Sequence, residues 1–313
     1  MKHAIGIDLG GTFIKFGVID QNGSILYTDI LPTSAETCAE DVIQNLIKAV
    51  KAAQKIADDK NIKLEGVGIG TPGIVDKTNR IVVGAAENIA GWENVPLADR
   101  IEASCGLKTV LNNDANMMGL GEQKFGAAKG DSDVLFITVG TGIGGAIIIN
   151  GKLFGGYDNR GTEMGHIPLI ANGVPCACGS VGCFEAYAST SALVKEFSEK
   201  ALKSGMNLEE IADGKLIVAL YKKSVDLAVE CMENHFNYLG RGIAGLVNIF
   251  SPQKVVIGGG ISEAGDFYIE KIDEYFRKYV MTDCAVNTTL VQAKLGNKAG
   301  MLGAAQMILD FNE

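Results

Sequence analysis

Apolar residues near the start of the chain fall into short runs separated by turn residues. Residues 4–9 have the pattern of a buried strand that ends at Gly10-Gly11-Thr12, and residues 13–19 form a second apolar run. An Asn22-Gly23 pair follows, and Asn-Gly after an apolar run is a strong short signal for a β-hairpin. The pattern therefore predicts three consecutive strands, the third over residues 25–30.

The same order of elements recurs in residues 133–155. Residues 134–139 have a strand pattern that ends at Gly140-Thr141-Gly142, and a second strand pattern ends at Asn150-Gly151. A unit repeated at this separation predicts two related domains that face each other. The alternative is that hairpins are simply common in α/β proteins, but two Gly/Thr turns at matching positions favour the repeat.

Helical periodicity occupies much of the remaining chain. Apolar residues recur at three- and four-residue spacing over residues 42–50 and 228–246, and residues 298–309 also have a helical pattern. Buried-strand patterns over residues 66–70 and 254–257 alternate with these helices. Strands that alternate with helices predict the α/β class.

The length of 313 residues suits two domains better than one core. Several glycines interrupt the pattern between residues 114 and 130, where we place the boundary. We expect an N-terminal α/β domain over residues 1–115, with the final helix, 298–313, packing back on it. A larger C-terminal α/β domain is then expected over residues 116–297.

Composition limits the possible partners and the compartment. The net charge of −9 and the lack of a long basic run argue against a nucleic-acid-binding surface, which needs Lys and Arg to neutralise phosphates. No apolar stretch reaches the roughly 20 residues that span a bilayer, and the strand pattern begins at once, so we expect neither a membrane span nor a signal peptide. Seven cysteines, three of them within residues 176–183, favour a reducing cytoplasm over a disulfide framework.

The glycine turns are candidate phosphate-binding sites. Gly140-x-Gly142-x-x-Gly145 matches a dinucleotide fingerprint in its letters, but a strand follows where that fingerprint requires a helix. The turns at 10–12, 140–142 and 258–260 can instead present N–H groups to phosphate oxygens. Asp8 precedes the first turn and can hold Mg²⁺, although a structural carboxylate that caps the turn is the alternative.

These turns carry a family resemblance. Asp8-Leu9-Gly10-Gly11-Thr12-x-x-Lys15 resembles the first phosphate motif of the actin-like ATPases, and is closest to the ROK family (repressor, open reading frame, kinase). Residues 139–145 resemble the second phosphate motif, and residues 258–260 the glycines on the adenosine side. The resemblance runs essentially end to end and implies an actin-like (ribonuclease H-like) fold, two related domains with a cleft between them. The ATP- and Mg²⁺-binding residues that it implies are Asp8, Gly10, Gly11, Thr12, Lys15, Thr138, Gly140, Thr141, Gly142, Gly258, Gly259 and Gly260.

Asn113 and Asp114 follow a predicted strand, 108–111, and begin a predicted helix. Open α/β sheets bind ligands at the carboxyl ends of their strands, and phosphoryl transfer needs one group to orient and deprotonate the attacking hydroxyl. The resemblance implies that Asp114 is this base and that Asn113 binds a sugar hydroxyl. The alternative is a helix N-cap without chemistry. The resemblance also assigns to the sugar pocket Gly73, Asn88, Glu163, His166 and Glu185, with a plain surface-loop position as the alternative for Asn88.

A second cluster has the residue types of a metal site. His166, Cys176, Cys178 and Cys183 lie within 18 residues and form a Cys₃His set, which is typical of closed structural zinc sites. The stretch Cys-x-Cys-Gly-x-x-Gly-Cys-x-Glu also resembles the ROK zinc motif. Buried free thiols or a redox pair are the alternatives. The other cysteines are expected to pack as small apolar side chains: Cys38, Cys105, Cys231 and Cys284.

The expected function is ATP-dependent phosphorylation of a hexose, as in the glucokinases of the family, at the 6-hydroxyl. N-acetylmannosamine, N-acetylglucosamine and fructose kinases of the family share the same residues and remain open. A sugar-responsive repressor or sensor is less favoured, because the first strand pattern starts within five residues of Met1 and we expect no DNA-binding segment before it. A protein-directed actin-like ATPase would leave Glu163, His166 and the cysteines unexplained. The resemblance also implies a homodimer.

Overall fold

The structure, a computed structural model, describes residues 1–84, 89–205 and 212–311. Its internal contacts divide the chain into two compact units. The first comprises Met1–Ser132, Ala146–Thr162 and Lys294–Glu313, and the second comprises Asp133–Gly145 and Glu163–Ala293. This division differs from the boundary predicted after residue 115, because helix α3 (Asp114–Phe125) packs against α9 (Ala299–Phe311) and stays in the first unit.

The first unit is built on a five-stranded mixed sheet with the strand order β3-β2-β1-β4-β7. β1 (His3–Leu9) pairs antiparallel with β2 (Phe13–Asp20) and parallel with β4 (Leu64–Thr71). The predicted Asn-Gly hairpin is present, since Gly23 has a φ of +83° between β2 and β3. The other elements of this unit are β3 (Ile25–Pro32), α1 (Ala39–Asp59), β5 (Ile74–Val75), β6 (Val82–Gly84), α2 (Leu97–Cys105), β7 (Thr109–Asn113), η1 (Tyr157–Asn159) and η5 (Gly296–Lys298).

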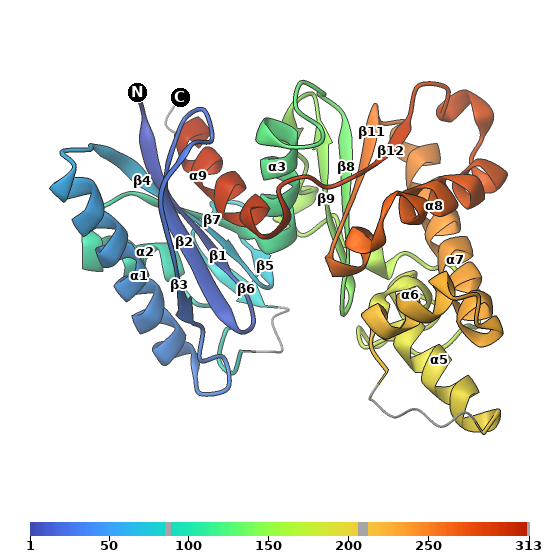
Figure 1. Ribbon diagram of the computed structural model, residues 1–313. Helices are drawn as coiled ribbons and strands as arrows, with labels where there is room; N and C mark the ends of the chain where they lie inside the picture. The colour runs from blue at the N-terminus through green and yellow to red at the C-terminus, as the bar shows by residue number, and fades with distance from the viewer. Residues whose placement is uncertain (85–88, 206–211, 312–313) are drawn as a thin grey trace. The chain divides into compact units, whose positions relative to one another are not determined.

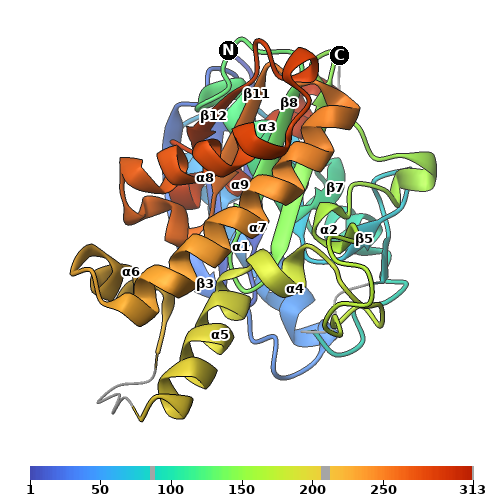
Figure 2. The ribbon, with the colours of Figure 1, turned by 90° about the vertical axis from the view of Figure 1, so that its right-hand side faces the viewer.

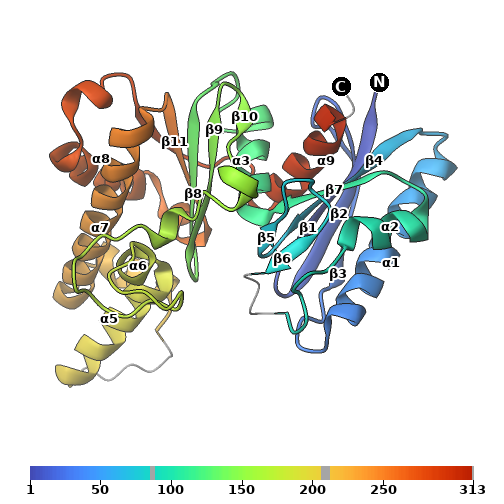
Figure 3. The same cartoon turned by 180° about the vertical axis from the view of Figure 1, so that it is seen from behind.

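Side-chain alternation along β1 gives this sheet two different faces. Ile5, Ile7 and Leu9 are buried in a core shared with α1 and α2, whereas Ala4 belongs to a core shared with α9. Figures 1 and 3 show α1 and α2 on one side of the sheet and α9 on the other. Gly6 lies on the α9 side, where a Cβ atom would overlap the main chain of that helix. Asp8 therefore also points toward α9, since side chains two residues apart share a face.

The second sheet repeats the arrangement of the first, with the strand order β10-β9-β8-β11-β12. Each sheet contains an antiparallel hairpin continued by parallel strands, which agrees with the repeat in the sequence. Strand β9 (Ile143–Ile149) is divided between the two units. The other strands of this sheet are β8 (Val134–Val139), β10 (Lys152–Leu153), β11 (Lys254–Gly258) and β12 (Thr289–Gln292).

Helices form the remainder of the second unit. The long helix α7 (Asp226–Phe250) packs against α8 (Asp266–Tyr279), and Figure 2 shows the two side by side. Among the described residues, no helix combines the length and the apolar character needed to cross a membrane. The shorter helices are η2 (Met164–His166), α4 (Glu185–Ala188), α5 (Thr190–Lys203), α6 (Gly214–Lys222), η3 (Gly260–Ala264) and η4 (Thr282–Cys284).

The cysteines outside the candidate metal cluster differ in exposure. Cys231 is buried, as predicted, and Cys105 and Cys284 are half-buried. For Cys38 the prediction was wrong, because this residue is exposed at the N-cap of α1, with its Sγ 3.5 Å from an oxygen of Asp41. The position is a helix boundary rather than a core position.

Candidate functional site

One edge of the first sheet gathers the predicted residues of that unit. Strands β1, β4 and β7 are parallel, with Asp8 paired to Gly70 and Thr71 paired to Asn113. Parallel strands end at the same edge, which is where open α/β sheets bind their ligands. This register brings to one edge Asp8, Gly73, Asn113 and Asp114.

Asp8 is a buried carboxylate next to the ammonium group of Lys15. Its exposure is 4%, and one of its oxygens lies 3.7 Å from Nζ of Lys15, its cross-strand partner in β2. Burial raises the pKa of Asp8 and Lys15 opposes that shift. A Cβ atom at Gly300, in the first turn of α9, would come within 2.8 Å of the Asp8 carboxyl carbon. The site therefore has an oxygen ligand suited to Mg²⁺, enclosed closely by the start of α9.

Replacing Asp8 with asparagine is expected to raise stability at neutral pH and to lower activity. The raised pKa means that the folded protein binds more protons than the unfolded chain above the ordinary value of 3.8. The protonated Asp8 side chain therefore contributes to the stability of the fold at low pH, and this contribution is lost as the pH rises through the folded-state pKa of Asp8. Melting curves from about pH 4 to pH 8 should show the variant gaining over wild type as the pH increases. A variant that is less stable than wild type at every pH would contradict this account.

The Gly10-Gly11-Thr12 turn is supported by a residue that the sequence analysis missed. Gly11 and Thr12 are exposed, while the buried Thr33 donates its hydroxyl to the carbonyl of Gly10 at 2.6 Å. The N–H of Thr33 also donates to the carbonyl of Thr12, at 2.9 Å. Thr33 follows β3, and the register of the β2–β3 hairpin places it opposite Thr12, so the Asn22-Gly23 signal could have located it. Thr33 thus fixes the backbone of the turn through two hydrogen bonds, while Gly11 and Thr12 remain accessible to a ligand.

Asn113 and Asp114 lie where β7 passes into α3, and both are half-buried. The side-chain oxygen of Asn113 caps the helix by accepting from the N–H groups of Ala115 and Asn116. Its amide nitrogen donates to the carbonyl of Gly73 at 3.2 Å. An amide nitrogen carries two hydrogens, so one donor of Asn113 is left for a ligand.

In the second unit, Glu185 lies against the Gly140-Thr141-Gly142 turn. Its Oε2 accepts from the N–H of Ile143 at 2.8 Å, and a Cβ atom at Gly142 would overlap that oxygen. The N–H of Thr190, at the start of α5, donates to the carbonyl of Gly140 at 2.9 Å. One oxygen of Glu185 therefore positions the turn, a contact that the sequence did not predict. The other oxygen is left for further contacts.

The third glycine turn lies beside the second. Gly258 at the end of β11 pairs in parallel register with Thr138 of β8. Gly259 follows with a φ of +93°, and a Cβ atom there would overlap the backbone of Val139. The structure thus brings together, at one edge of the second sheet, Thr138, Gly140, Thr141, Gly142, Gly258, Gly259 and Gly260.

The turn that carries Glu163 and His166 packs on the same hairpin. A Cβ atom at Gly165 would overlap the carbonyl of Ile143, so this turn lies directly against the start of β9. Glu163 is exposed and His166 is half-buried. The remaining predicted sugar residue, Asn88, lies outside the residues that the structure describes.

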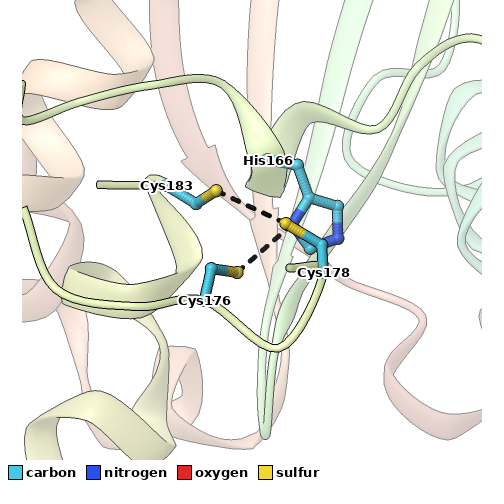
Figure 4. Close-up of side chains that lie close together, drawn as sticks. All are labelled: His166, Cys176, Cys178 and Cys183. Atoms are coloured by element: carbon cyan, nitrogen blue, oxygen red, sulfur yellow. Dashed lines mark hydrogen bonds between the residues drawn. The ribbon is translucent and has the colours of Figure 1, made fainter. Parts of the chain in front are cut away.

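The predicted metal ligands form a compact cluster, shown in Figure 4. One donor atom from each of His166, Cys176, Cys178 and Cys183 lies within 4.8 Å of all the others. Sγ of Cys176 is 3.7 Å from Nδ1 of His166, and Sγ of Cys178 is 3.6 Å from Sγ of Cys183. A tetrahedral site with Zn–S bonds of about 2.3 Å has S···S edges of about 3.8 Å, so these donors fit a zinc ion.

The thiols of this cluster differ in their acidity. Burial raises the pKa of Cys183 to about 12, whereas the backbone N–H of Ser180 lowers the pKa of the exposed Cys178. None of the seven cysteines forms a disulfide. A buried thiol that stays protonated at neutral pH becomes a thiolate when it ligates a metal ion, with release of its proton.

Glycines and one tyrosine shape the loop around this cluster. Gly182 has a φ of +74°, and a Cβ atom there would overlap the carbonyl of Ile170. The N–H of Val174 donates to the hydroxyl of Tyr187 at 2.7 Å, which ties the loop to α4. Tyr187 was missed from the sequence, because its distance from the cysteines follows no ligand spacing.

Comparison with known proteins gives one consistent result. The family model described as "ROK family" matches residues 4–310. A glucokinase of Streptomyces coelicolor is 37% identical over 318 residues, covering 98% of each chain. A ROK family glucokinase from Streptomyces griseus, solved in complex with glucose and AMPPNP, has a TM-score of 0.82 and 36% identity, covering 97% of this chain and 98% of that one. A ROK hexokinase from Thermus thermophilus has a TM-score of 0.84 and 32% identity over 99% of each chain.

Proposed function

Because the chain belongs to the ROK family, we propose that it is an ATP-dependent hexose kinase that converts glucose and ATP to glucose 6-phosphate and ADP. Relatives named glucokinase, 33–37% identical over nearly the full length, support this activity. The observation that carries the proposal is the shared edge of β1, β4 and β7. The buried carboxylate of Asp8 lies near the end of β1, and Asp114 follows the end of β7 at the start of α3.

The glycine turns bind the nucleotide in this proposal. The turns at 10–12 and 140–142 offer N–H groups to the phosphates, and the turn at 258–260 borders the adenosine. Asp8 would hold Mg²⁺, which neutralises charge on the phosphates when bound. Lys15 adds a positive charge beside this position. The nucleotide analogue in the Streptomyces griseus structure supports ATP as the phosphoryl donor.

Asp114 is the general base. Its carboxylate accepts the proton of the 6-hydroxyl while that oxygen bonds to the γ-phosphorus, and the bond from phosphorus to the bridging oxygen of ADP breaks. Asn113, held by its cap and by Gly73, uses its remaining N–H to orient a neighbouring hydroxyl. The fixed cap keeps Asp114 at a defined position at the end of β7.

The remaining sugar hydroxyls are bound by Glu163, His166, Glu185 and Asn88. Carboxylates accept charge-assisted hydrogen bonds from hydroxyls, which are stronger than neutral ones. Glu185 has one oxygen on the N–H of Ile143, so its second oxygen serves the sugar. His166 faces Cys176 with Nδ1, which leaves Nε2 for a hydroxyl.

A zinc ion held by His166, Cys176, Cys178 and Cys183 is structural in this proposal. Four protein donors complete a tetrahedral shell, so the ion has no open position for substrate. When bound, it holds the loop and fixes the ring of His166, and through it the Nε2 that binds sugar. None of the seven cysteines is in a disulfide, which supports a cytoplasmic location, and we further propose a homodimer.

A coupled assay of ADP release over a panel of sugars tests the activity. Glucose is expected to give the highest kcat/KM, ahead of mannose, fructose, N-acetylglucosamine and N-acetylmannosamine. Glucose-6-phosphate dehydrogenase then verifies the position of the new phosphate, and polyphosphate in place of ATP tests the donor. A preference for an N-acylhexosamine would move the proposal to the related kinases. ATP turnover that no sugar changes would instead favour a protein-directed ATPase.

A further inference from the structure

Glu122 of α3 is a fully buried carboxylate bound by main-chain N–H groups. Its exposure is 0%, and it accepts from the N–H groups of Ala127 at 2.7 Å, Lys294 at 2.9 Å and Leu295 at 2.7 Å. No ion pair to Glu122 occurs among the described residues. Three donors to one carboxylate satisfy a charge that would otherwise be costly to bury. A Cβ atom at Gly126 would overlap Oε2 of Glu122, so glycine at 126 leaves space for the carboxylate.

These bonds join two segments that are distant in the sequence. Ala127 follows the end of α3, where the chain is about to leave the first unit after Ser132. After a passage through the first unit over Ala146–Thr162, the chain returns to it for the last time at Lys294, and Leu295 leads into η5 and α9. Glu122 therefore connects the segment that first leaves the first unit with the segment that returns to it last.

The two helices joined in this way meet backbone to backbone. A Cβ atom at Gly121 of α3 would overlap the carbonyl of Ala299, and one at Gly303 of α9 would overlap the carbonyl of Met117. Figure 1 shows α3 and α9 adjacent to each other. At these two glycines the main chains leave no room for a side chain, so a shift of one helix along the other would bring main-chain atoms into overlap.

Each helix also begins at a proposed catalytic position. α3 starts at Asp114, the proposed base. The segment before α9 contains Asn297, whose oxygen accepts from Nζ of Lys15 at 3.3 Å, and the first turn of α9 encloses the Asp8 carboxylate. We propose that Glu122 is a positioning residue that holds α3 and the start of α9 in one register, and so keeps Asp114 in its working position relative to Asp8 and Lys15. This inference rests on the proposed kinase function.

The test compares Glu122→Gln with Gly126→Ala. An amide in place of the carboxylate turns an NH₂ group toward at least one of the three N–H donors. An alanine methyl at 126 displaces Oε2, which accepts from Ala127, so both changes disturb the contacts of the same carboxylate. Each variant is expected to lower kcat by about tenfold or more with the KM for glucose within about twofold, since small misplacements of catalytic groups have large effects. The double variant should match the singles, because both remove one set of contacts. Glu36→Gln on the surface and Gly245→Ala on the exposed face of α7 are the matched controls and should keep wild-type kcat.

Hydrogen exchange supplies a readout that does not depend on activity. In Glu122→Gln, at least one of the amides of residues 127, 294 and 295 should exchange faster, and those of the β1–β2 hairpin should not change. Unchanged exchange at all three of these amides, or a kcat within twofold of wild type in both variants, overturns the proposal. If wild type itself turns over no sugar, the kinase assignment fails, and the exchange result still decides whether Glu122 holds these segments.

Discussion

Asp114→Asn is expected to lower kcat for glucose phosphorylation by about two to four orders of magnitude. Asparagine has nearly the same size and keeps an oxygen that can accept from the N–H of Ala115, which Asp114 does at 2.8 Å. It cannot take a proton from the sugar hydroxyl, so the transition state loses its base while ground-state binding is retained. The measurement is the coupled ADP-release assay with glucose, giving kcat and KM separately.

A matched control uses the exposed Asp59 at the end of α1. Asp59→Asn carries the same chemical change and should keep the wild-type kcat, because it touches no part of the proposed site. The melting temperature of Asp114→Asn should stay near that of wild type, since Asn113 still caps α3. A kcat for Asp114→Asn within a few-fold of wild type would mean that another group removes the proton.

Cys183→Ser is expected to remove the bound zinc and to raise the KM for glucose by about tenfold or more. Cys183 is the buried member of the cluster, and a serine hydroxyl does not replace a thiolate as a zinc ligand at neutral pH. The loop then loses its central support, and the ring of His166 loses its fixed orientation. Metal analysis of the purified protein should give one zinc per chain for wild type and much less for the variant.

The exposed Cys38 provides the control for this experiment. Cys38→Ser should retain one zinc and full activity, because Cys38 lies on α1 and not in the cluster. Removal of zinc from wild type by a chelator should reproduce the rise in KM, and added zinc should reverse it. Wild-type protein that contains no metal yet phosphorylates glucose normally would refute the structural role of the ion.

Local features of this protein were predictable from its sequence. The Asn22-Gly23 hairpin depends on residues that accept a positive φ, and that preference belongs to the residues themselves. The cysteines and His166 are close in the chain, so their residue types alone predict a metal cluster. The start of α3 at Asp114 was predicted from a strand pattern followed by a helix pattern. The catalytic and binding roles of these residues remain predictions.

Contacts between distant segments required the tertiary structure. Glu122 joins the end of α3 to a segment more than 170 residues away. The place of α3 in the first unit follows from its close packing on α9, which depends on glycines whose partners lie far along the chain. Sequence patterns report the preferences of neighbouring residues, so periodicity determined the strands, turn residues determined the hairpin, and ligand-type residues close in the chain determined the metal cluster. The sequence does not show which helices approach so closely that a methyl group has no room between them. That close approach depends on packing in three dimensions, and only the tertiary structure determined it.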